Sequence, residues 1–221
     1  MRSFEKIYAI AAKRKGGGAA LEALIEKPLP RNKIAAIADD RWLSSMARSL
    51  FEAGFNWAVI DAKWDGFEAA FHRFDPSRIV RYGDEQIDRL LSDDSIVRNG
   101  AKIMAVVDNA HFIRELTAEY GSAGRFFADW PDTNFVGLLE VLTNRGSRLG
   151  GVTGQRMLRR LGRSSFILSP DVIARLIAEG VVAKAPSGRR HMQAVQDAFN
   201  EWIRQSGRSL TEISRVLAMS V

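Results

Sequence analysis

Four side chains able to bind a planar polar ligand recur at helical spacing between residues 42 and 52. They are Trp42, Ser45, Ser49 and Glu52. Because they are three or four positions apart, one helix presents them along one side. Together they offer a ring for stacking, two hydroxyls and a carboxylate for hydrogen bonds. The spacing predicts one wall of a binding pocket, with a solvated helix residue as the alternative for Glu52.

An apolar stripe runs beside this polar one and predicts the helix that positions it. Leu43, Met46, Ala47 and Leu50 form the stripe. Their period indicates a helix over residues 40–53, which Gly54 ends. Trp57 lies three residues after this stop, where one interpretation is a core side chain that closes the turn.

Helical spacing recurs along the rest of the chain, and alternating strand patterns are nearly absent. Asn99 and Ser209 are predicted helix caps, and Ser209 with Glu212 forms a capping box. Further helices are expected near residues 3–14, 84–92, 134–145, 153–161 and 170–179. The pattern predicts an all-α protein of about ten helices, with an N-terminal helical appendage at 1–38 and one domain at 39–221.

Positive charge is concentrated near the C-terminal end. Residues 151–221 hold 11 Lys and Arg against 5 Asp and Glu, whereas residues 1–150 hold 21 of each. The segment Arg145–Arg163 contains six arginines and no acid. A local basic stretch beside a neutral body is typical of a phosphate-binding face, and a solvated surface is the alternative.

The segment 153–180 has the pattern of a helix–hairpin–helix. An arginine-rich helix ends at Gly162, a short connection follows, and Ser169-Pro170 caps and opens the next helix. Such a hairpin offers backbone N–H groups and a helix N-terminus to a phosphate. The residues expected to contact phosphate are Arg159, Arg160, Gly162, Arg163, Ser164 and Ser169. The alternative is a hairpin with a purely structural role.

Composition excludes several classes of protein and site. The chain has no cysteine, which excludes disulfides and thiolate chemistry. With only three histidines, His72, His111 and His191, no metal site is expected, and all three are interpreted as packing or surface residues. No apolar run approaches the length of a membrane span and no secretory signal is recognised, so we expect a cytoplasmic protein without membrane contact.

A series of short motifs resembles the DNA-3-methyladenine glycosylase type I family, part of the helix–hairpin–helix DNA glycosylase superfamily. The motifs are Glu52-Ala-Gly-Phe-Asn-Trp57, Phe67, Phe71-His-Arg-Phe-Asp-Pro76, Asp88-Arg-Leu-Leu91, Ile96-Val-Arg98, Lys102-Ile103 and Asn109-Ala110. A weaker match runs from Gly162-Arg-Ser-Ser-Phe166 to Gly180. The ordered series is far more specific than any one piece.

The resemblance implies roles for the residues singled out above. Trp57 matches the base-stacking tryptophan, and an indole face suits a cationic alkylated base. Ser49 stands where the family has its pocket glutamate, and Glu52, one turn later, is the candidate replacement, so both are expected catalytic residues. Trp42 and Ser45 would contact the base. Lys102 matches a family lysine and is a candidate phosphate contact.

The chain also departs from the family. The family's structural zinc is held by cysteines and histidines that this sequence lacks, so neither metal nor cofactor is expected. No acid follows the hairpin helix, where the stretch reads Val181-Val-Ala-Lys-Ala185. The resemblance implies a lighter mechanism than that of superfamily members with a catalytic aspartate at that position.

We therefore expect a monofunctional DNA glycosylase of base-excision repair, with double-stranded DNA containing alkylated bases as its partner and a monomer as its state. It would flip out alkylated adenine, 3-methyladenine being the expected base, and hydrolyse its N-glycosidic bond. One alternative is a catalytically reduced helix–hairpin–helix DNA-binding protein of the same fold. Another is an all-α interaction protein with no nucleic-acid role.

Overall fold

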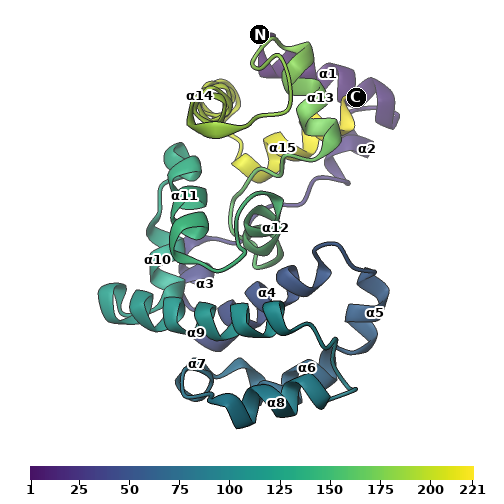
Figure 1. Ribbon diagram of the computed structural model, residues 1–221. Helices are drawn as coiled ribbons and strands as arrows, with labels where there is room; N and C mark the ends of the chain where they lie inside the picture. The colour runs from purple at the N-terminus through teal and green to yellow at the C-terminus, as the bar shows by residue number, and fades with distance from the viewer. The chain divides into compact units, whose positions relative to one another are not determined.

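The chain folds entirely into helices. A computed structural model, which describes residues 1–221, contains fifteen α-helices, two short 3-10 helices and no strand (Figure 1). The all-α prediction is confirmed. The helix number exceeds the predicted ten because several helices have only four to seven residues, too few to show a period in sequence.

Contacts divide the chain into two compact units. Unit 1 comprises Met1–Leu29, Trp130–Leu138 and Gly162–Val221, and unit 2 comprises Pro30–Asp129 and Leu139–Leu161. These units divide the chain at other points than the predicted boundary at residue 38. That boundary stays a prediction.

Unit 1 holds the two ends of the chain. Its α15 packs against α1, α13 and α14. Ser169 caps α13 with Pro170 in the first turn, and Ser209 forms the predicted capping box with Glu212. The helices of this unit are α1 (Phe4–Lys15), α2 (Gly18–Glu22), η2 (Asp132–Asn134), the start of α11 (Phe135–Arg145), α13 (Pro170–Ala178), α14 (Gly188–Ser206) and α15 (Leu210–Met219).

Unit 2 is built around α4, which packs against α9 and α12. Asn99 caps α9 and Asp75 caps α7, because each accepts a hydrogen bond from a backbone N–H of the first turn. The helices are α3 (Arg31–Ala35), α4 (Asp39–Glu52), α5 (Trp57–Ala62), α6 (Trp64–Ala70), η1 (His72–Phe74), α7 (Pro76–Ile79), α8 (Asp84–Ser92), α9 (Gly100–Tyr120), α10 (Ala123–Asp129), the rest of α11 and α12 (Val152–Arg160).

The 3-10 helix η1 has an unusual backbone. His72, Arg73 and Phe74 have φ angles of +50°, +56° and +58°, in the left-handed region that side chains with a Cβ disfavour. Packing offsets this strain, because Phe74 stacks on Trp64 with ring centroids 5.5 Å apart. The guanidinium of Arg41 also donates a hydrogen bond to the Arg73 carbonyl at 2.7 Å.

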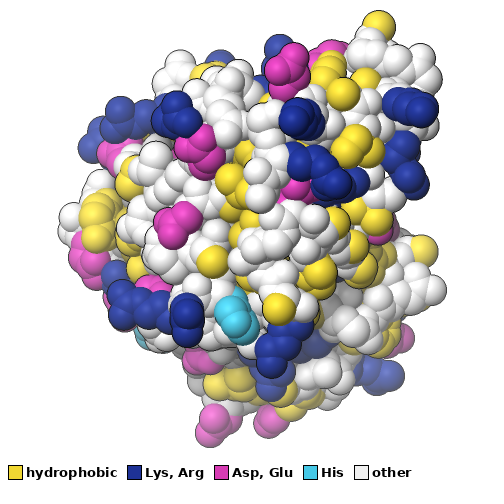
Figure 2. All heavy atoms as spheres, turned by 90° about the horizontal axis from the view of Figure 1, so that it is seen from above, with side chains coloured by type: hydrophobic (Ala, Val, Ile, Leu, Met, Phe, Trp, Pro, Cys, Tyr) yellow, Lys and Arg dark blue, Asp and Glu magenta, His cyan; other side chains and the backbone are white.

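The surface mixes charges of both signs. Figure 2 shows Lys and Arg side chains in separate groups with Asp and Glu between them. Among the six arginines of 145–163, Arg145, Arg160 and Arg163 each form an ion pair with an acid from elsewhere in the chain. These three charges of the predicted basic stretch are therefore neutralised within the fold. Separately, the helices include none with the length and apolar character of a membrane span.

Candidate functional site

Helix α4 is buried along both of its predicted stripes. Leu43, Met46, Ala47 and Leu50 lie in the core, as their spacing predicts. The polar stripe is buried as well, because α12 packs against Ser45, Ser49 and Glu52 and Phe127 of α10 stacks on Trp42. The solvated interpretation of Glu52 is wrong, since this residue is only 4% exposed.

Arg160 of α12 joins the two expected catalytic residues. Its Nη1 donates to Ser49 Oγ at 3.2 Å, and its Nη2 donates to Glu52 Oε2 at 2.5 Å. The other carboxylate oxygen of Glu52 accepts from Arg48 Nε at 3.2 Å, and Arg48 also pairs with Asp61. Two guanidinium groups thus satisfy a buried carboxylate that would otherwise be costly to hold in the interior.

Trp57 presents an open ring beside this ion-pair network. It begins α5, whose start is fixed by Asn56, since the Asn56 side chain accepts from Ala58 N at 2.9 Å. Trp57 is 47% exposed, so the alternative interpretation as a core tryptophan is wrong. The guanidinium carbon of Arg156 lies over the ring, 4.9 Å from its centroid. The indole face therefore already holds a cation.

The other two members of the polar stripe lie deeper. Trp42 is fully buried and stacks on Phe127 with ring centroids 4.1 Å apart, and its Nε1–H has no hydrogen-bond acceptor. Ser45 is also buried and donates to the Met157 carbonyl at 3.4 Å. Helix α12 therefore contacts Ser45, Ser49, Glu52 and Trp57. Trp42 instead stacks on Phe127 of α10.

Lys102 closes the end of α4. Its Nζ donates to the carbonyl oxygens of Phe51 at 3.2 Å and Ala53 at 2.8 Å, groups that lack a partner within the helix. Burial lowers the pKa of Lys102 below its ordinary value, and the positive charge of Arg148 adds to this effect. No local pattern around Lys102 indicates this shift of its pKa. Its direct contacts are structural, and a phosphate contact stays a prediction.

The hairpin residues of unit 1 have internal partners. Arg163 is 5% exposed, and its guanidinium donates to Asp132 Oδ1 and to the Trp130 carbonyl, each at 2.5 Å. Ser164 Oγ donates to Asp132 Oδ2 at 2.5 Å. To reach a phosphate, Arg163 has to leave these partners.

Gly162 and Ser169 lie at the two ends of the connection in the predicted hairpin. Gly162 has φ of +78°, and an added Cβ would lie 2.5 Å from Leu29 Cγ, so both conformation and packing require glycine. Ser169 Oγ accepts from Val172 N at 3.3 Å, as an N-cap does. Helix α12, with half-buried Arg159, belongs to unit 2 and α13 to unit 1. Their joint role as a DNA clamp stays a prediction.

Sequence reasoning missed Arg48, Asp61 and the contact of Arg156. The signal available was the spacing of Arg156 and Arg160, four positions apart within a stretch without acids. That spacing places both on one side of α12. The pairing with α4 and α5, about a hundred residues earlier in the chain, is not visible in a local pattern.

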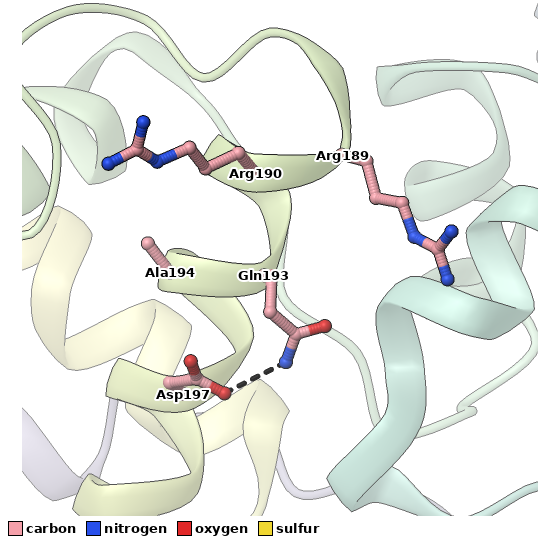
Figure 3. A pocket seen from close by; sticks show the side chains of 5 residues that line it. All are labelled: Arg189, Arg190, Gln193, Ala194 and Asp197. Atoms are coloured by element: carbon pink, nitrogen blue, oxygen red, sulfur yellow. Dashed lines mark hydrogen bonds between the residues drawn. The ribbon is translucent and has the colours of Figure 1, made fainter.

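Hollows elsewhere on the surface carry mixed charge, and two of them lie on α14 and beside η1. One is lined by Arg189, Arg190, Gln193, Ala194 and Asp197, all from α14, and Gln193 donates to Asp197 at 2.8 Å (Figure 3). The other adjoins η1 and is lined by Asp40, His72, Arg73, Asp75 and Arg78. Neither includes a residue of the predicted pocket.

The zinc implied by the family resemblance does not fit the residues of this chain. There is no cysteine, and nowhere do three or more His, Asp or Glu side chains gather closely enough to hold a metal ion.

Comparison with known proteins supports the resemblance read from the motifs. Residues 35–138 match the family model described as methyladenine glycosylase. The DNA-3-methyladenine glycosylase 1 of Escherichia coli (strain K12) is 36% identical over 59 residues, which cover 27% of this chain and 32% of that protein. The Haemophilus influenzae DNA-3-methyladenine glycosylase is 34% identical over an equal length. The matches span about a third of these relatives.

Solved structures support the fold. A variant of 3-methyladenine DNA glycosylase I in complex with 3-methyladenine aligns with a TM-score of 0.52 and 24% identity, over 63% of this chain and 81% of that one. A mutant of the Staphylococcus aureus enzyme aligns with a TM-score of 0.52 and 22% identity, over 75% and 90%. The resemblance of this chain to the DNA-3-methyladenine glycosylase type I family is confirmed.

Proposed function

We propose that this protein is a monofunctional DNA glycosylase of base-excision repair that hydrolyses the N-glycosidic bond of alkylated adenine, with 3-methyladenine as its substrate. The observation that carries the proposal is Trp57, an exposed ring within the matched residues 35–138, beside the Ser49 and Glu52 network. A flipped base needs a stacking surface and polar groups at its edge. The names of the matched relatives point to the same substrate.

The roles of the residues follow from their contacts. Trp57 stacks on the flipped base, and its negative ring face favours the positive charge of an alkylated adenine. Because this base leaves readily once it carries that charge, the site mainly has to bind it and orient a water. Ser49 Oγ accepts a hydrogen bond from Arg160, which leaves its own O–H to donate. Glu52 acts through Arg160, as the group that holds the guanidinium against Ser49.

The partner in this proposal is double-stranded DNA that contains alkylated bases, and the protein acts as a cytoplasmic monomer. The excess of basic over acidic residues in 151–221 supports DNA as the partner. Backbone contacts are assigned to Arg159, Gly162, Ser169 and Lys102, while Arg163 and Ser164 support the connection from within.

Release of free base tests the proposed activity. The full chain is incubated with DNA that carries 3-methyladenine, and released base is separated and counted against the spontaneous rate. We expect release by the wild type and release slower by about 5- to 150-fold by W57A, since base stacking contributes about 1–3 kcal/mol. No release above the spontaneous rate would contradict the proposal.

A second function is favoured by the residues around Ser49. A serine stands in place of the family glutamate, and both oxygens of Glu52 are already bound by guanidinium groups. These features suit a catalytically reduced DNA-binding protein of the same fold. That protein would bind duplex in a salt-dependent manner and leave no abasic product.

A further inference from the structure

Arg156 of α12 makes a cation–π contact with Trp57. Its guanidinium lies over the indole ring, and no hydrogen bond or ion pair holds it. Arg160, one turn later on the same side of α12, is fixed by Glu52 and Ser49. The two arginines therefore differ in freedom, because one is anchored and the other rests on a ring.

Helix α12 positions the guanidinium of Arg156 over the indole ring of Trp57. The contacts of Arg160 and of the Met157 carbonyl with Ser45 hold α12 against α4. The backbone at Arg156 is therefore held in place, while its exposed side chain can change rotamer without breaking a polar contact.

Trp57 cannot hold a base and a guanidinium on the same face. Stacked rings and stacked guanidinium groups both lie within about 6 Å of the ring centroid, the distance at which Arg156 already lies. A cationic base is also repelled by the positive charge of Arg156. A base can stack on this face only after the guanidinium has left.

We propose that Arg156 covers the stacking face of Trp57 in the free protein and moves to a DNA backbone phosphate when duplex binds. The inference rests on the proposed function, which assigns Trp57 to the flipped base. Arginine pairs strongly with phosphate, and Arg156 has no acid within the protein to release. Arg156 therefore uncovers the indole face of Trp57 when the base arrives as part of DNA, because only DNA brings the phosphate.

The first test is the affinity of the full-length protein for 3-methyladenine as a free base. Without DNA, Arg156 is only a competitor, so R156A binds this base about two- to fivefold more tightly than wild type, the factor that an exposed cation–π contact is worth. The matched control is R114A on α9, which removes an exposed arginine of the same unit that makes no polar contact. R114A binds the base as the wild type does.

The second test is the salt dependence of binding to an undamaged duplex. Loss of one phosphate contact lowers the slope of log affinity against log salt concentration by about one. We expect that decrease for R156A and a wild-type slope for R114A.

The two tests separate this inference from the proposed function. If R156A binds the base no more tightly than wild type, while both bind it measurably, Arg156 is no competitor and the inference is overturned. If no variant binds or releases 3-methyladenine, the proposed function fails, and the duplex test alone decides. An unchanged slope for R156A then overturns the inference, and a slope lower by one supports the phosphate contact.

Discussion

Arg160 and Glu52 form an ion pair between α12 and α4 in which the carboxylate is almost fully buried and the guanidinium side chain is 29% exposed. The pair lies next to Ser49 and one helical turn from Arg156. It therefore fixes the distance between the two helices that carry the predicted pocket.

Loss of this pair is expected to destabilise unit 2. R160A leaves a buried carboxylate with one partner, and the free energy of unfolding should fall by about 2–3 kcal/mol, at the low end for buried pairs because Arg160 is partly exposed. Urea unfolding measures the change. The control is R89A, because the side chains of Arg89 and its partner Glu85 are each 72% exposed. A loss below about 0.5 kcal/mol is expected there. Equal losses in the two variants would contradict the buried-pair interpretation.

Substitution of Arg163 distinguishes a structural role of this residue from a contact with DNA. R163A removes both donors to Asp132 and the Trp130 carbonyl, so we expect a loss of about 2 kcal/mol in unfolding free energy. Duplex affinity at low salt should change little, because this guanidinium points into the protein. A large drop in affinity with unchanged stability would instead assign Arg163 to a phosphate.

The left-handed backbone of η1 predicts that glycine in place of Arg73 stabilises the fold. R73G removes the Cβ from a residue with φ of +56° and keeps the carbonyl that Arg41 binds. The free energy of unfolding should stay equal or rise by up to about 1 kcal/mol. At helical Arg114, also exposed, the same substitution should cost about 1 kcal/mol. Thermal and urea unfolding of the two variants provide the comparison.

Tyr82 predicts a loss of stability at alkaline pH. Burial raises the pKa of Tyr82 to about 12, with a smaller increase from Asp75 and an opposing effect of Arg78. Since the folded-state pKa lies above the ordinary value near 10, the stabilising contribution is complete below pH 10 and is lost as the pH rises towards 12. Unfolding measured from pH 9 to 12 should show this decrease in wild type, and Y82F should lack it.

Local signals in the sequence predicted much of the fold. Ser169-Pro170, Ser209 with Glu212, and Asn99 each lie at a helix start, since capping depends on a few neighbouring residues. The sequence pattern did not predict the helices α5, α6 and α7, because each spans fewer than two turns. The buried rings Trp42 and Phe127 are 85 positions apart, and only the folded chain shows that they stack.

The candidate site was predicted less completely. The spacing of Ser49 and Glu52 placed them on one side of a helix, which the structure confirms. What covers that side depends on how α12 packs against α4, a long-range contact. The ion pairs of the six-arginine stretch were not predicted for the same reason, because local charge says nothing about acids such as Glu119 and Asp132 that approach from elsewhere.

The division into two units gives each of them its own optical reporter. Trp42, Trp57 and Trp64 belong to unit 2, whereas Trp130 and Trp202 belong to unit 1. Variants that keep Trp42 or Trp202 as the single tryptophan, both buried, would report the melting of one unit each. Coincident fluorescence transitions would mean that the chain unfolds as one cooperative body, and separate midpoints would mean that one unit can lose its structure while the other persists.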